Sequence, residues 1–105
     1  MKKLSKAQQA VMDMAKKNID KARTMDYPEW LKDMNSYYDN HEDALKEAVA
    51  KGRYKDYWMD GRNGIVLTHC NSRTLIKLEE MGLIEIIEDS NGQPYGIDKI
   101  KVLNY

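Results

Sequence analysis

Residues 71–84 read NSRTLIKLEEMGLI, a pattern that predicts a short helix with both ends marked, running directly into a β-strand. Asn71 is a good N-cap, because its side-chain oxygen can accept from a free amide of the first helical turn. Gly82 suits the position just beyond the helix, because glycine readily adopts the left-handed conformation that ends one. Residues 83–87, LIEII, then have the composition of a strand.

This helix is expected to have two different faces. Leu75 and Leu78 fall on one side together with Gly82, at three- and four-residue spacing, and we expect that side to be buried. The opposite side is expected to be exposed, and it carries Ser72, Arg73, Ile76, Lys77 and Glu80.

The same segment resembles the recognition helix and first wing strand of winged helix-turn-helix domains. Many small members of that superfamily have a hydroxyl or amide residue, then Arg-Thr-Leu, a further Leu and a Gly-Leu-Ile ending. Residues 72–75, Leu78 and residues 82–84 follow this order here. Residues 4–12, LSKAQQAVM, are similar to the first helix of the family. The resemblance covers about half the chain, and residues 25–60 have no place in the minimal family pattern.

The resemblance implies an α+β fold, a winged helix-turn-helix with an enlarged helical insert and a C-terminal β-hairpin wing. Winged helices bind DNA most often, and some bind RNA or only other proteins. Because members of the family often form dimers and the first helix is long, the resemblance also implies a homodimer. Fold alone does not determine the activity.

Size and composition indicate one domain over residues 1–105. Hydrophobic content is 42% and charged content 32%, as in soluble globular proteins. We expect no membrane partner, because no run of about 18 apolar residues is present and the first residues lack the apolar segment of a signal peptide. A single cysteine, Cys70, fits a reducing, cytoplasmic setting.

The net charge is zero, which counts against a simple nucleic-acid binder, because such proteins usually carry a basic excess. The charges are unevenly distributed, however. Residues 1–24 hold seven basic and two acidic residues, whereas residues 25–60 hold five basic and nine acidic residues. A basic face therefore requires that the acidic middle of the chain point elsewhere.

The N-terminal half is expected to be helical. Ser5 and Gln8 have capping-box spacing at the start of a helix of about twenty residues. Asp26, followed two residues later by a proline, begins a second helix. Asn40 is expected to cap a third, which runs over residues 41–51 and ends before a glycine.

Residues 53–70 allow two interpretations. One is a hairpin or a strand–loop–strand, because the turn-forming residues 60–64 separate aromatic and β-branched positions. The other is a loop followed by one short strand at residues 65–68.

Residues 84–88 and 97–103 are expected to form the last hairpin, around an Asn91-Gly92 pair of the kind favoured in tight turns. This hairpin would be the wing.

The exposed face of the helix over residues 71–82 is the leading candidate site for double-stranded DNA, because a helix in the major groove reads bases with side chains near its N-terminus. Arg73 could make the paired contact to guanine, and Ile76 could pack on a thymine methyl group. The remaining candidate contacts are Ser72, Lys77, His69 and Arg62, of which Ser72 and Lys77 could hold phosphates and His69 could approach one. For the helix, the alternative is a solvated face without a partner, which the acidic Glu80 favours. For His69, the alternative is an ordinary histidine in a loop.

An enzyme is not expected. His69 and Cys70 are adjacent, and adjacent strand residues point to opposite faces, so they do not suggest a nucleophilic pair. We expect Cys70 to be a small packed residue. The sequence has no Cys-x-x-Cys, no His-x-x-x-His and no glycine-rich phosphate loop, so it implies neither a metal nor a cofactor.

Seven aromatic residues fall within the acidic middle of the chain, and phenylalanine is absent. Core packing is the first interpretation of this set, because the rings must supply aromatic core volume. The alternative is an exposed patch that binds a protein, because Tyr and Trp are common interface anchors. The candidates for such a patch are Tyr37, Tyr38, Tyr57 and Trp58.

Two functions therefore remain open. The leading one is a DNA-binding winged-helix protein, a small transcriptional regulator acting as a dimer. The alternative is an accessory protein that binds a host nucleic-acid-processing protein and inhibits or adapts it, since short, neutral winged-helix proteins are similar to accessory proteins of bacteriophages. The basic first helix favours the leading function, and the acidic aromatic middle favours the alternative.

Overall fold

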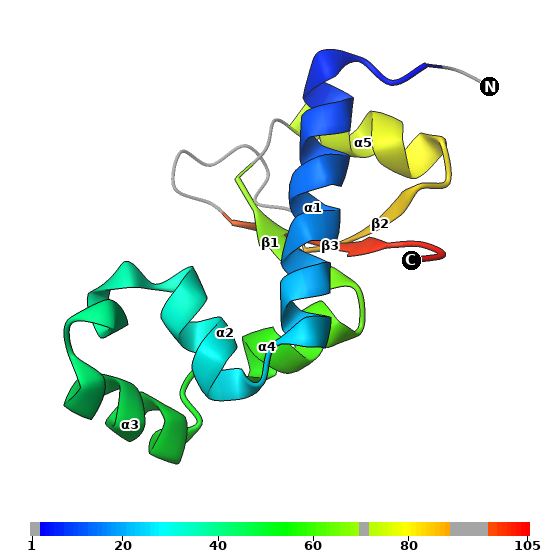
Figure 1. The fold of residues 1–105 in the computed structure, drawn as a ribbon. Coiled ribbons are helices and arrows are strands. Elements are labelled where there is room, and N and C mark those ends of the chain that lie inside the picture. Colours follow the sequence, from blue (N-terminus) through cyan, green and yellow to red (C-terminus); the bar gives the residue numbers. More distant parts are fainter. Residues whose placement is uncertain (1–2, 70–71, 89–96) are drawn as a thin grey trace.

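The computed structural model describes residues 3–69, 72–88 and 97–105 and has an α+β fold. Its sheet is antiparallel, three-stranded in the described residues, with strand order β1-β3-β2. In chain order (Figure 1) the elements are α1 Lys6–Thr24, α2 Tyr27–Met34, the 3-10 helix η1 Ser36–Asp39, α3 Glu42–Lys51, α4 Lys55–Arg62, β1 Ile65–Thr68, α5 Ser72–Glu80, β2 Ile84–Glu88 and β3 Asp98–Val102.

α1 is the central helix, and both halves of the molecule pack against it. The predicted capping box is confirmed: the Ser5 amide donates to Gln8 Oε1 at 2.9 Å, and the Gln8 amide donates to Ser5 Oγ at 3.2 Å. Its first half contacts α5 and the sheet, and its last turns contact α2 and α4 (Figure 1). In the described part of the chain, no helix combines the length and the apolar character that crossing a bilayer requires.

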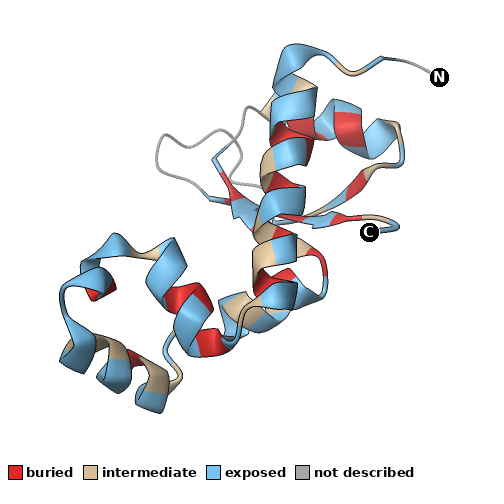
Figure 2. Ribbon diagram, viewed as in Figure 1, coloured by how far each residue is buried: buried red, intermediate tan, exposed pale blue. Residues whose placement is uncertain are grey.

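The first buried cluster joins α1, α5 and the sheet (Figure 2). Leu75 and Leu78 are 1% and 0% exposed, so the predicted inner face of α5 is confirmed. They pack with apolar side chains from α1 and all three strands, namely Val11, Met12, Ala15, Ile19, Val66, Ile84, Ile100 and Val102. α5 is therefore fixed on two sides, by α1 and by the hairpin that follows it.

The end of α5 also matches its sequence. Gly82 has φ +75°, and its amide donates to the Glu79 carbonyl at 2.9 Å while the Leu83 amide donates to the Leu78 carbonyl at 3.1 Å. These two bonds form the Schellman motif, which satisfies the last carbonyls of a helix. The predicted cap at Asn71 lies outside the described residues, as does the Asn91-Gly92 turn. The strands of the last hairpin pair as predicted.

A second buried cluster lies in the helical segment that follows α1 in the sequence, beyond the C-terminal end of α1 and away from the sheet (Figure 2). It contains Ala22, Tyr27, Trp30, Leu31, Tyr38 and Ala48. Two long-range hydrogen bonds close it: the Tyr54 amide donates to Tyr27 Oη at 3.0 Å, and Trp58 Nε1 donates to the Met25 carbonyl at 3.2 Å. The interpretation of the aromatic residues as core volume is thus confirmed for most of the set.

The hairpin interpretation of residues 53–70 is wrong, because α4 forms where a strand was considered. Gly61 lies in this helix rather than in a turn, and a Cβ built there would come within 2.8 Å of Ala22 Cβ. The glycine therefore permits the close approach of α4 to α1. The second interpretation is confirmed for the strand, which forms at Ile65–Thr68, and is wrong for the loop, because residues 55–62 are helical.

The cap of α3 also differs from expectation. His41, not Asn40, is the N-cap residue, and it makes no side-chain capping hydrogen bond. Asn40 instead ends η1, where its amide donates to the Tyr38 carbonyl. The predicted end at Gly52 is confirmed by its φ of +62°.

Tyr105 connects the end of the described chain to α1. Its hydroxyl donates to both carboxylate oxygens of Asp20, at 2.7 and 2.8 Å, and Arg23 Nη2 donates to its backbone oxygen at 2.8 Å. The hydrogen bond to Asp20 raises the pKa of Tyr105 above its ordinary value, because ionisation would remove the donor beside a carboxylate.

Candidate functional site

The outer face of α5 carries the central part of the predicted DNA site. Arg73, Ile76 and Lys77 are exposed, and Ser72 is half-buried. Ile76 keeps 45% of its surface open to solvent although Leu75, its neighbour, is buried. Two cationic side chains and one aliphatic side chain are therefore presented together by a helix whose opposite face is locked in the core.

Acidic groups border this face. Glu80 is exposed, and Glu79 Oε2 accepts from the Ile86 amide at 2.8 Å. Glu79 thereby ties α5 to the edge of β2. The hairpin strands carry both charge signs, with Glu85 opposite Lys101 across the β2–β3 ladder. The described part of the hairpin is thus not a basic surface, and the positive side chains of α5, Arg73 and Lys77, are matched in number by Glu79 and Glu80.

Arg62 lies elsewhere. Its Nη1 donates to the Ala22 carbonyl at 3.2 Å, and its guanidinium lies 5.0 Å from the centre of the Trp58 ring. These contacts hold α4 against the C-terminal end of α1, whereas α5 lies beside the N-terminal half of that helix (Figure 1). The structure therefore does not bring Arg62 together with the α5 residues.

His69 follows β1 directly and is exposed. Residues 70–71, which connect it to α5, lie outside the described residues, and so does Cys70. Of the predicted DNA contacts, the structure places Ser72, Arg73, Ile76 and Lys77 on one helix, with His69 at the end of the strand that precedes it.

The four aromatic candidates for a protein-binding patch do not form one surface. Tyr38 is only 7% exposed and belongs to the helical core, and Trp58 is half-buried with its indole N–H bonded to a backbone carbonyl. Tyr37 is exposed but stacks on His41, with ring centres 4.3 Å apart. Tyr57, 46% exposed, is the member of the set that borders a sizeable apolar cavity.

This cavity, of about 330 Å³, lies between the helical segment and the sheet. Its walls are mostly apolar and come from three helices, α1, α2 and α4, and two strands, β1 and β3, the latter through Lys99. The lining includes Trp30 and Met34 of α2, Tyr57 and Gly61 of α4, Asn18 of α1 and residues 65–67 of β1. Volumes above about 300 Å³ are typical of ligand sites, so the cavity is a second candidate site.

Sequence reasoning missed the cavity because it did not place α4. One signal was available: Tyr54, Tyr57, Trp58 and Gly61 recur at three- and four-residue spacing, as expected for one side of a helix. That side faces α1 and α2 in the structure.

Within residues 3–69, 72–88 and 97–105, no three His, Cys, Asp or Glu side chains gather closely enough to hold a metal ion. Comparison with protein family models, with curated proteins and with solved structures finds no match for this chain.

Proposed function

We propose that this protein binds double-stranded DNA through the exposed face of α5. The observation that carries the proposal is the grouping of Arg73, Ile76 and Lys77 on the first two turns of a helix whose inner face is completely buried. A helix that enters the major groove needs such a face and a rigid mount, because base contacts require fixed side-chain positions.

Each side chain has a role in this proposal. The Arg73 guanidinium would donate two parallel hydrogen bonds to guanine, and Ile76 would pack on a thymine methyl group. Lys77 would attract phosphates without reading the sequence. Lys3 and Lys6, at the start of α1, would add phosphate contacts on the same end of the molecule.

The winged-helix arrangement belongs to this proposal. It is supported by the order of a capped helix and an antiparallel hairpin, and by the position of α5 against α1 and the sheet. One difference bears on the helix-turn-helix part: α4 and α5 are separated by residues 63–71, which include β1, rather than by a turn of about three or four residues. In this chain β1 and the hairpin, rather than a preceding helix, would orient α5 on DNA. The protein would act as a small dimeric regulator.

The test is selection from a randomised duplex pool, followed by fluorescence anisotropy with the preferred duplex. Arg73→Ala should weaken binding to that duplex by about 1–3 kcal/mol and relax the preference at one base pair. Lys46→Ala removes the same charge from the exposed surface of α3, far from α5, and should leave binding unchanged. Failure of the wild-type protein to enrich any duplex would refute the proposal.

A second candidate function is a protein-binding adaptor of the kind that bacteriophages direct at host nucleic-acid enzymes. It is favoured by the neutral net charge and by the apolar cavity beside Tyr57. Under this candidate α5 would be only a structural element, and the site would lie between the helical segment and β1.

A further inference from the structure

Among the described residues, β1 is an edge strand, and no described backbone group bonds to its outer N–H and C=O groups. It pairs only with β3 in the described sheet, with Val66 opposite Ile100. The Val102 amide donates to the Gly64 carbonyl at 2.8 Å, and hydrogen-bonded pairs alternate along an antiparallel ladder. Val66 therefore bonds toward β3, and the N–H and C=O groups of Ile65 and Leu67 point to the other side. No backbone group of another described element bonds to them.

The two edges of the sheet are treated differently by the sequence. β2 carries Glu85 and Glu88, has a register irregularity between Ile86 and Glu88, and has its Ile86 amide occupied by Glu79. Charges, bulges and covered amides are the usual devices that stop a strand from pairing with another chain. β1 reads Ile-Val-Leu-Thr and has neither a charged residue nor a register shift against β3.

The apolar cavity lies beside β1. Its lining includes the three consecutive residues 65–67 and also Lys99, which lies opposite Leu67 on β3. Because side chains alternate between the two faces of a strand, Ile65, Leu67 and Lys99 lie on one face of the sheet, and Val66 points to the other. The opposite wall of the cavity includes Met34 and Tyr57, which are 44% and 46% exposed.

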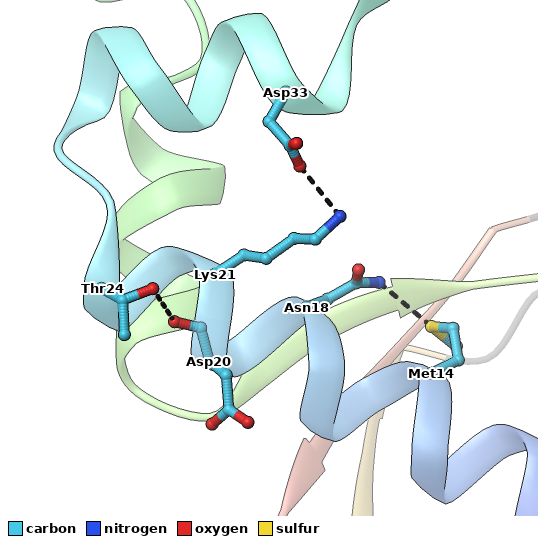
Figure 3. A network of polar contacts seen from close by, with 6 residues as sticks. All are labelled: Met14, Asn18, Asp20, Lys21, Thr24 and Asp33. Carbon is cyan, nitrogen blue, oxygen red and sulfur yellow. Dashed lines mark hydrogen bonds and ion pairs between the residues drawn. The ribbon is translucent and has the colours of Figure 1, made fainter.

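The two charged residues that line the cavity have opposite signs and pair with each other: Lys99 Nζ lies 3.8 Å from Asp60 Oδ2. Outside the lining, Lys21 Nζ of α1 lies 2.8 Å from Asp33 Oδ2 of α2 (Figure 3). Asn18 lines the wall, and its amide nitrogen donates only to the weakly accepting sulfur of Met14 at 3.1 Å (Figure 3). A neutral, apolar wall beside free backbone groups complements an uncharged extended chain.

We propose that an extended segment of a partner protein, with apolar residues at alternate positions, adds as a strand to the open edge of β1. Its backbone bonds to the N–H and C=O groups of Ile65 and Leu67, and alternate side chains enter the cavity between β1, α2 and α4. In strand addition the main chain supplies affinity, and the pockets for alternate side chains supply specificity. This inference rests on the second candidate function and is independent of DNA binding by α5.

A single extended chain fits this edge better than a second copy does. The edge lies beside a cavity walled by α2 and α4 of the same molecule, and a second copy would have to bring β1 there together with its own α2 and α4. A peptide needs only the width of one strand, about 4.8 Å from its neighbour.

The experiment uses a library of random seven-residue peptides displayed on phage, selected on the whole protein. Selected peptides, labelled with a fluorophore, are then titrated with wild-type, Leu67→Pro and Leu67→Val protein. Proline at position 67 removes an outward N–H without touching a bond to β3, and valine keeps both the N–H and an apolar side chain. Thermal unfolding of each variant checks that the sheet is intact.

A second arm acts on the peptide and needs no variant. Each selected peptide is made in two N-methylated forms, one methylated at the odd-numbered residues and one at the even-numbered residues. One form lacks the N–H groups that would face β1, and the other lacks the N–H groups on the outer edge of the peptide. This arm remains decisive if Leu67→Pro does not fold.

We expect enriched peptides to carry apolar residues at alternate positions. Leu67→Pro and one N-methylated form should weaken binding about tenfold or more, because a directed hydrogen bond is lost and a strand is pushed away. Leu67→Val and the other N-methylated form should bind as the parent does. Binding that both N-methylated forms retain would mean an apolar ligand site without strand pairing, and it would overturn the proposal, as would a library with no enriched peptides.

Two controls separate the outcomes. The wild-type protein is titrated separately with duplex and with peptide, so failure of the DNA proposal leaves this one standing and the reverse also holds. Sedimentation of the wild-type protein should show no dimer that Leu67→Pro abolishes, because such a dimer would assign the β1 edge to a second copy.

Discussion

Leu75 and Leu78 fix the orientation of α5. Both are buried between α1 and the sheet, and the Leu78 carbonyl also accepts the bond that closes the helix end. With these positions fixed, Arg73, Ile76 and Lys77 must face outward, because residues one and two apart on a helix point in different directions. The exposure of the candidate site thus follows from the core.

Leu78→Ala should lower the free energy of unfolding by about 2–5 kcal/mol, because it leaves a cavity at a position with no solvent exposure. Ile76→Ala, on the same helix, should change it by less than about 0.5 kcal/mol. Denaturant titration followed by circular dichroism measures both. A loss below about 1 kcal/mol for Leu78→Ala would mean that α5 is oriented differently.

Elements defined by local signals could be predicted from the sequence. α1, α2 and α5 each begin or end with a capping residue, and the last hairpin has alternating apolar positions. α4 could not be predicted, because the turn-forming residues around Gly61 outweighed the aromatic spacing until the contact with Ala22 was known. The shape of the cavity beside Tyr57 depends on that tertiary contact.

The register of β1 gives a test at the level of this strand. Val66→Pro should destabilise the protein by at least about 2 kcal/mol, because it leaves the buried carbonyl of Ile100 without its donor. Leu67→Pro should cost less than about 1 kcal/mol, since proline is tolerated where a strand N–H faces outward. Thermal unfolding compares the two directly, and equal losses would contradict the assignment of the open edge.

The whole molecule separates its charges along its length. It is elongated, with extents of 47 × 29 × 21 Å, and α5 and the acidic segment with α2 and α3 lie toward opposite ends of α1 (Figure 1). A chain with zero net charge can therefore keep Arg73 and Lys77 away from the acidic segment, although Glu79 and Glu80 bring the net charge of α5 itself to zero. The acidic segment then has little effect on a ligand at α5, because charges more than about 8–10 Å apart interact weakly at physiological salt.

The dependence of duplex binding on salt tests the proposed role of α5 most directly. Anisotropy of a labelled duplex is measured at several salt concentrations with the wild-type, Lys77→Ala and Lys46→Ala proteins. We predict that the wild-type affinity falls with salt and that Lys77→Ala lowers the slope of the logarithmic plot by about one unit, because one phosphate contact is lost. Lys46→Ala should keep the wild-type slope. No binding by micromolar wild-type protein at about 50 mM salt, or equal slopes for all three proteins, would contradict DNA binding through α5.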